Sequence, residues 1–86
     1  MPQAKKNHPS VWKFIAAVRK RDRRAAWVSY QEARLAGLAA EALFWDMFWP
    51  VAGTPVGRAL VELYHDSRRG LCDFEIGLER CIMSIV

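Results

Sequence analysis

The chain has few of the residues from which catalytic, metal and disulfide sites are built. It contains two cysteines and two histidines among 86 residues, too few for a disulfide scaffold. The spacings of His8, His65, Cys72 and Cys81 match no close-pair zinc motif. Glycine-rich phosphate loops and the Gly-x-Ser-x-Gly nucleophile motif are also absent. We therefore expect no enzyme activity, no catalytic residue, no metal, no cofactor and no small-molecule substrate.

The sequence also lacks a hydrophobic run long enough to cross a membrane. Its longest apolar stretch, residues 38–51, contains Glu41 and Asp46 and is shorter than the roughly 20 residues that a membrane-spanning helix needs. Nearer the N-terminus, Lys13 and Arg19 interrupt the apolar positions, which excludes the hydrophobic segment of a secretory signal. We expect a cytoplasmic protein that makes no membrane contact.

No segment alternates apolar and polar residues as a half-buried strand would, whereas several segments follow helical spacing. A chain of this length can bury one hydrophobic core. We therefore predict an all-α fold, a compact bundle of four to five short helices. Residues 1–9 are expected to form a flexible basic arm, because they contain two prolines and two lysines. Residues 10–86 are expected to form a single helical domain.

Local signals place the helix boundaries. Ser10 and Asp73 are suited to cap the first and the last helix, and the pair Thr54-Pro55 is a typical helix start. Glycines at positions 37 and 70 are expected to stop the helices that precede them. The helix over residues 38–49 should end at Pro50.

Asp22 leaves two alternatives open for residues 11–36. It occupies a position where the apolar stripe of the first helix should continue. The first helix can therefore end near Arg21, with Asp22 capping a second helix from Arg23. Alternatively, one long helix runs through this region and neighbouring arginines hold Asp22. We favour the break, because Trp27 would otherwise emerge on the charged side of a single helix.

The most conspicuous local feature is a cluster of positive charge. The net charge is +4, and it divides into +7 over residues 1–36 and −3 over residues 37–86. Five cations fall within six consecutive positions, close in sequence to Trp12, Trp27 and Tyr30. Such a run can grip phosphates while aromatic rings stack on bases, or it can be a solvated helix face. The candidate residues for binding nucleic acid or another polyanion are Lys13, Arg19, Lys20, Arg21, Arg23 and Arg24.

A second candidate surface is aromatic. Over residues 44–49 the large apolar side chains point in nearly every direction around a helix. Either this helix is central and wrapped by the others, or part of it is an interface for a partner or for a second copy of the chain. The candidate interface residues are Phe44, Trp45, Phe48 and Trp49.

One short string resembles segments of two known families. The stretch from His8 to Ile15 resembles a segment of Mutator-like transposases, and its part from Ser10 onward is similar to the tail of the Hha/YmoA nucleoid-associated regulators. The two families are unrelated, so we carry no function over from either. We interpret the string as a capped amphipathic helical turn.

Two functions follow from these surfaces. The first is a small non-enzymatic binding protein that acts on nucleic acid, a ribonucleoprotein or an acidic protein through its basic helical face. The alternative is a protein–protein inhibitor or adaptor that uses residues 44–49, either as a single chain or as a homodimer. Small regulators from phages and mobile elements, anti-CRISPRs among them, offer an analogy of size and charge only.

Overall fold

The computed structural model describes residues 8–85, and all of its regular structure in that range is helical. This confirms the predicted all-α bundle, while the predicted flexible arm lies mostly outside the described residues. None of the helices in this part of the chain is long and apolar enough to span a membrane. The elements are α1 (Pro9–Arg19), α2 (Arg23–Leu35), α3 (Ala40–Leu43), the π-helical turn η1 (Phe44–Phe48), the 3₁₀ turn η2 (Trp49–Val51), α4 (Pro55–Arg68) and α5 (Phe74–Met83).

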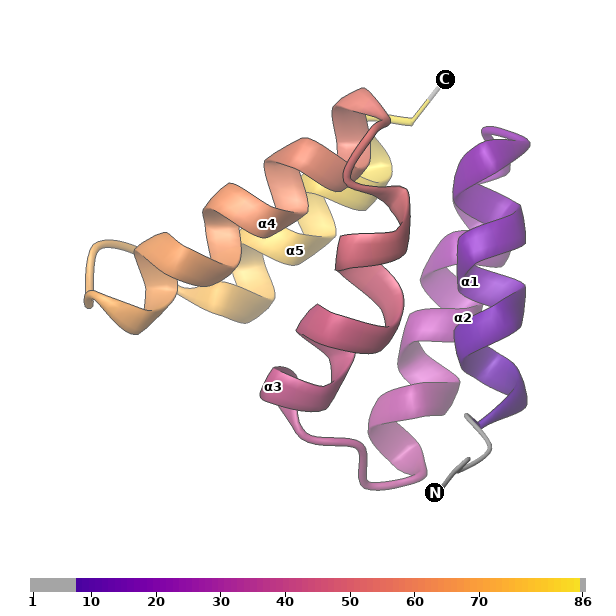
Figure 1. Cartoon of the computed structure of the whole chain (residues 1–86), viewed down its shortest axis with the longest axis horizontal. Helices are drawn as coiled ribbons and strands as arrows, with labels where there is room; N and C mark the ends of the chain where they lie inside the picture. Colours follow the sequence, from indigo (N-terminus) through magenta and orange to yellow (C-terminus); the bar gives the residue numbers. More distant parts are fainter. Residues whose placement is uncertain (1–7, 86) are drawn as a thin grey trace.

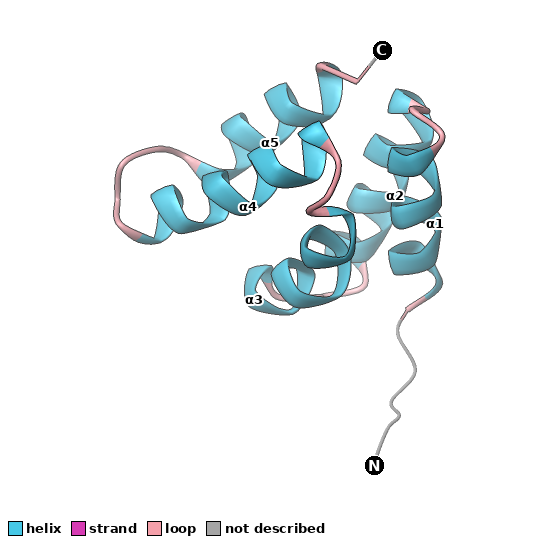
Figure 2. Cartoon of the chain, turned by 45° about the horizontal axis from the view of Figure 1, so that its top comes forward, coloured by secondary structure: helices cyan, strands magenta, loops and turns pink. Residues whose placement is uncertain are grey.

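The helices form two antiparallel pairs with a continuous helical segment between them (Figure 1). α1 packs against α2, and α4 packs against α5. The segment formed by α3, η1 and η2 contacts α1 on one side and α4 on the other, while α2 also contacts α5. Figure 2 shows that only short loops connect these elements. The central segment therefore joins the two pairs into one core.

Every element contributes to that core. Its largest fully buried side chains include Phe14 of α1, Leu43 of α3, Phe48 of η1, Leu60 of α4 and Leu78 of α5. The ring centroids of Phe14 and Phe48 lie 6.2 Å apart, a distance typical of interacting aromatic pairs. The first pair is thus held to the central segment by aromatic packing, and the predicted single core is present.

α1 begins two residues earlier than the sequence predicts, and Ser10 is not its cap. His8 occupies the capping position, and its Nδ1 accepts a hydrogen bond of 3.1 Å from the backbone N–H of Ser10. Pro9 is the first helical residue, where its missing N–H costs nothing. Ser10 is fully buried, with its hydroxyl 2.8 Å from the same histidine nitrogen. Sequence reasoning missed this cap because histidine is not among the usual capping residues.

The break at Asp22 is confirmed, and the alternative of one long helix is wrong. Arg21 adopts a left-handed conformation with φ of 59°, which ends α1 and reverses the chain. The Asp22 side chain then accepts a hydrogen bond of 3.1 Å from the backbone N–H of Ala25, as an N-cap does. The tight turn brings the last residues of α1 and the first residues of α2 to one corner of the molecule.

The predicted helix over residues 38–49 exists in altered form. It begins at Ala40, widens into the π-helical turn η1 and narrows into η2. The widening is visible in the backbone N–H of Trp49, which bonds to the carbonyl of Phe44 five residues earlier. Pro50 lies inside η2 and so does not end the helix. In a regular α-helix its ring would clash with the carbonyl of Asp46, so the wider turn relieves a conflict built into the sequence.

The predicted boundaries of the second pair are confirmed. The Thr54 hydroxyl accepts a hydrogen bond of 2.9 Å from the Gly57 N–H, and an Asp73 carboxylate oxygen accepts one of 3.0 Å from the Ile76 N–H. Glycines 37 and 70 have φ of 87° and 76°, the left-handed conformation that terminates a helix at low cost. Thr54 thus caps α4 directly after the central segment, and Asp73 caps α5 after the loop that follows α4.

Candidate functional site

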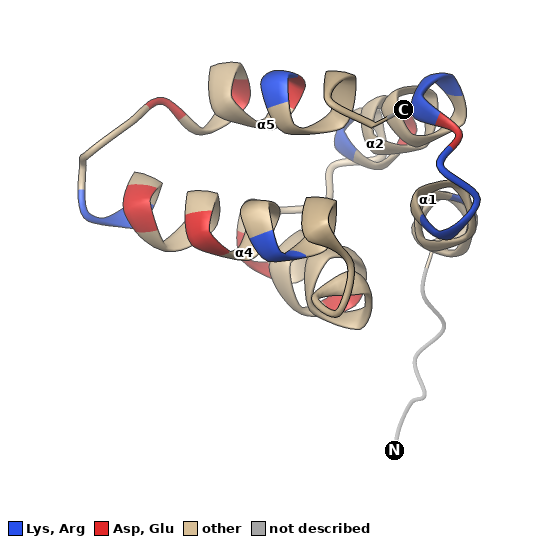
Figure 3. Cartoon of the chain, turned by 90° about the horizontal axis from the view of Figure 1, so that it is seen from above, with Lys and Arg blue, Asp and Glu red and all other residues tan. Residues whose placement is uncertain are grey.

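The turn between α1 and α2 places five cations at one corner of the molecule, which we call the basic corner. Figure 3 shows an almost continuous run of Lys and Arg there, interrupted by one acidic residue. All five side chains are exposed, and neither of the two ion pairs formed within residues 8–85 involves them. The carboxylate of Asp22 is engaged as the cap of α2. The basic corner consists of Arg19, Lys20, Arg21, Arg23 and Arg24.

Helix stability explains only part of this cluster. Arg19 and Lys20 lie at the C-terminal end of α1, where a cation interacts favourably with the helix dipole. Arg23 and Arg24 lie in the first turn of α2, which contains no acidic residue. A cation at this end is unfavourable by roughly 0.3–1 kcal/mol. Arg23 donates a hydrogen bond of 3.2 Å to the carbonyl of Met83 at the end of α5. For Arg24 the structure gives no internal partner, so its position suits an external anion.

Of the other residues predicted to accompany the basic run, Lys13 lines a groove between α1 and α2 together with Lys20, whereas the two aromatic residues of α2 lie apart from the run. Lys13 forms an ion pair of 3.8 Å with Glu32 on the face shared by α1 and α2. Tyr30 is only 2% exposed, so the expectation that its ring could stack on a ligand is wrong. Trp27 is half-buried and stacks on Tyr30 with ring centroids 5.8 Å apart. These two rings belong to the packing of α2.

The four predicted interface aromatics separate into two buried and two exposed side chains. Phe44 and Phe48 are 3% and 0% exposed, so the prediction that they form an interface is wrong. Both lie in the core, with the ring of Phe44 stacked on Tyr64 at 4.5 Å. Trp45 and Trp49 are 57% and 56% exposed, and their ring centroids lie 6.0 Å apart. Residues 44–49 therefore form both core and surface, with Phe44, Met47 and Phe48 facing inward and the two tryptophans facing outward.

A groove between α1 and η1 brings together residues that the sequence presents as two separate features. Trp12, which is 62% exposed, lines it from α1, and Trp45 lines it from η1. Arg19, seven residues after Trp12, lies along the same groove, as does Asp46. Arg19 also lines a second groove with Arg21 beside the start of α4. The exposed indoles and the basic corner are thus connected through Arg19. We call Trp12, Trp45 and Trp49 the indole surface.

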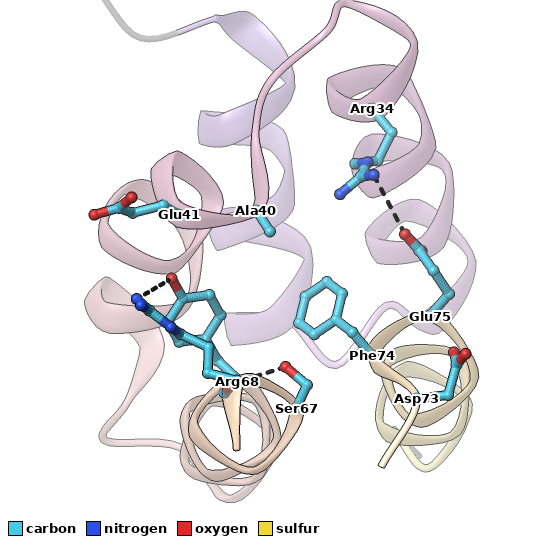
Figure 4. A pocket seen from close by; sticks show the side chains of 9 residues that line it. Arg34, Ala40, Glu41, Ser67, Arg68, Asp73, Phe74 and Glu75 are labelled. Atoms are coloured by element: carbon cyan, nitrogen blue, oxygen red, sulfur yellow. Dashed lines mark hydrogen bonds and ion pairs between the residues drawn. The ribbon is translucent and has the colours of Figure 1, made fainter. Parts of the chain in front are cut away.

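A polar depression lies at the opposite end of the molecule, between α2, α4 and α5 (Figure 4). Arg34 pairs with Glu75 at 3.4 Å, and Glu75 also accepts a hydrogen bond of 2.7 Å from the hydroxyl of buried Tyr30. Arg68 donates to the hydroxyl of Tyr64 at 3.3 Å. The Arg34–Glu75 pair joins α2 to α5, whereas the Arg68 hydrogen bond lies within α4, and the charged side chains carry both signs. The depression therefore offers no single charge by which a ligand would be selected.

Within the part of the chain that the structure describes, no group of three or more His, Cys, Asp or Glu residues lies in a position to hold a metal ion. His65, one of the nominal ligands, packs edge-on against Phe44 with ring centroids 5.4 Å apart. No protein-family model, curated protein or solved structure matches the chain. Its function is therefore inferred from its own side chains.

Proposed function

We propose that this protein is a non-enzymatic binding protein that contacts nucleic acid through its basic corner. The observation that carries the proposal is the set of five exposed cations at residues 19–24. None of them forms an ion pair with another residue of the described chain. Like charges held this close repel one another, and phosphate groups remove that repulsion while releasing their own counterions. Arg24, at the unfavourable end of a helix dipole, adds to this argument.

The proposal is tested by reversing charge at the corner without unfolding it. In the double variant Lys20→Glu/Arg24→Glu, one new carboxylate lies at the C-terminal end of α1 and the other in the first turn of α2. Their interactions with the helix dipoles have opposite signs, so stability should change by less than about 1 kcal/mol. Binding to duplex or single-stranded nucleic acid, measured by fluorescence anisotropy, should weaken more than about tenfold at roughly 50 mM salt.

The matched control is Arg58→Glu/Arg80→Glu, which makes the same change in net charge on exposed positions of α4 and α5. This control should lower affinity much less than the corner variant. In addition, log affinity of the wild type should fall linearly with log salt, by about 0.9 per phosphate contact on duplex DNA. Equal losses of affinity for nucleic acid in the two double variants would mean that net charge alone determines binding. The basic corner would then not be the contact site.

A second candidate function is protein–protein binding through the indole surface. It is favoured by one observation, the exposure of more than half of each of Trp12, Trp45 and Trp49, because tryptophan is enriched among residues that dominate interface energies. A partner bound in this way should be retained at high salt, since apolar contacts are not screened. Salt dependence therefore separates this function from the first.

A further inference from the structure

The indole surface and the basic corner are adjoining parts of the same face. Trp12 and Arg19 both line the groove between α1 and η1. Their separation of seven residues is two helical turns, or about 10 Å along α1. Aromatic rings beside cations in one groove are the arrangement that proteins use to bind unpaired nucleotides.

We propose that the ligand of this face is single-stranded nucleic acid, whose bases stack on Trp12 and Trp45 while its phosphates follow Arg19 into the basic corner. This inference rests on the proposed function and specifies the class of nucleic acid. Unpaired bases expose the flat faces that indoles bind, whereas a duplex hides those faces in its own stack.

The charges along the groove determine on which side the phosphates of the strand lie. Asp46 lies in the groove beside Trp45, and its carboxylate repels phosphate. Arg19 lies along the same groove and also beside Arg21 in the neighbouring one. The phosphates are therefore placed on the Arg19 side, and the bases are placed over the indoles. The ring of Trp45 is held edge-on against the buried Phe44, with centroids 4.9 Å apart, so its exposed face is presented with little loss of side-chain freedom.

The test compares an oligothymidylate of about 12 nucleotides with an abasic strand of equal length and with a duplex of the same length. Affinity is measured by anisotropy, and stacking by quenching of tryptophan emission. Wild type should bind oligothymidylate most tightly. Trp12→Ala and Trp45→Ala should each weaken this binding by about five- to 150-fold, which corresponds to 1–3 kcal/mol per stacked base. They should hardly affect the abasic strand. Trp12→Phe should restore much of the loss.

Two further variants separate stacking from charge. Trp12→Ala should leave the slope of log affinity against log salt concentration unchanged, because it removes no phosphate contact. Arg19→Ala should reduce the magnitude of this slope by about 0.7. Leu71→Ala removes an apolar side chain that is 66% exposed in the loop between α4 and α5, outside the indole surface, and should bind as wild type does. Circular dichroism melting of each variant checks that its fold is intact.

The outcomes distinguish this inference from the function on which it rests. Salt-dependent binding that is equal for the duplex, the abasic strand and oligothymidylate, and that does not depend on either tryptophan, would overturn the inference and leave the basic corner as a polyanion site. Binding of an acidic polyglutamate peptide as tightly as oligothymidylate would overturn it likewise. No binding of any nucleic acid at low salt would overturn both.

Discussion

At the scale of single residues, Tyr30 is the group whose ionisation the fold alters most. Burial raises the pKa of its hydroxyl well above the usual value, and the hydrogen bond to Glu75 and the negative charge of that carboxylate raise it further. The folded state therefore favours the neutral phenol. This stabilisation is complete below the unfolded pKa near 10 and is lost as the pH rises from there towards the folded pKa.

Replacing Tyr30 by Phe should lower the free energy of unfolding by about 0.5–1.5 kcal/mol at neutral pH, because one hydrogen bond is lost. The difference in the free energy of unfolding between wild type and variant should shrink by about 1.4 kcal/mol for each pH unit above about 10, since only the wild type has the hydroxyl with the raised pKa. Urea denaturation of both proteins at about pH 7 and about pH 11 measures this change. An unchanged difference at the two pH values would mean that the hydroxyl is not protected by the fold.

At the scale of elements, the junction between η2 and α4 depends on a close backbone approach. A Cβ atom added to Gly57 would overlap the carbonyl oxygen of Val51. The same carbonyl accepts a hydrogen bond of 2.7 Å from the Thr54 hydroxyl, and this hydroxyl accepts from the Gly57 N–H. Gly57 therefore lets the first turn of α4 pack directly on the end of the central segment.

Gly57→Ala should consequently destabilise the protein by about 1–3 kcal/mol through overpacking. Helix propensity alone would predict the opposite sign, because alanine is favoured over glycine by about 1 kcal/mol inside a helix. Gly53→Ala is the control, since no atom lies within 4 Å of the added Cβ, and it should change stability by less than about 0.5 kcal/mol. A thermal melt in which Gly57→Ala is the more stable of the two would contradict the close approach.

At the scale of the whole molecule, large apolar side chains are exposed outside the indole surface as well. They include Leu35 on α2 and Ile76 on α5, which are 88% and 57% exposed. Exposed apolar side chains of this size are typical of interaction sites. The sequence predicts a homo-oligomer that forms through residues 44–49. Because we propose that the indole surface binds nucleic acid, we expect the contact between copies on the α2–α5 side instead.

Light scattering at micromolar concentration should therefore give a mass of at least two chains. Leu35→Asp should reduce it to one chain without unfolding the protein, because the side chain is exposed in the monomer. Trp45→Asp, the equivalent change on the indole surface, should leave the mass unchanged. A wild-type mass of one chain would contradict the oligomer. Dissociation by Trp45→Asp would instead assign the indoles to contacts between copies.

The helix boundaries could be predicted from the sequence because their causes are local. Asp22, Thr54 and Asp73 each cap a helix by accepting a hydrogen bond from an N–H three residues ahead. The two glycines that end helices need only their own left-handed conformation. The basic corner was predictable for the same reason, since its cations are nearly consecutive. The His8 cap was missed because only the neighbouring geometry allows an imidazole to serve in this role.

The two surfaces of residues 44–49, by contrast, were decided by tertiary structure. Helical periodicity cannot show which side of a nearly all-apolar segment is covered, because α1 and α4 cover it from distant parts of the chain. Their packing buries Phe48 and leaves Trp45 exposed. The same packing brings Trp12 and Trp45 to one groove, although 32 residues lie between them in the sequence. The sequence by itself therefore determined the helices and the charge, whereas the joining of indoles and cations on one face required the folded core.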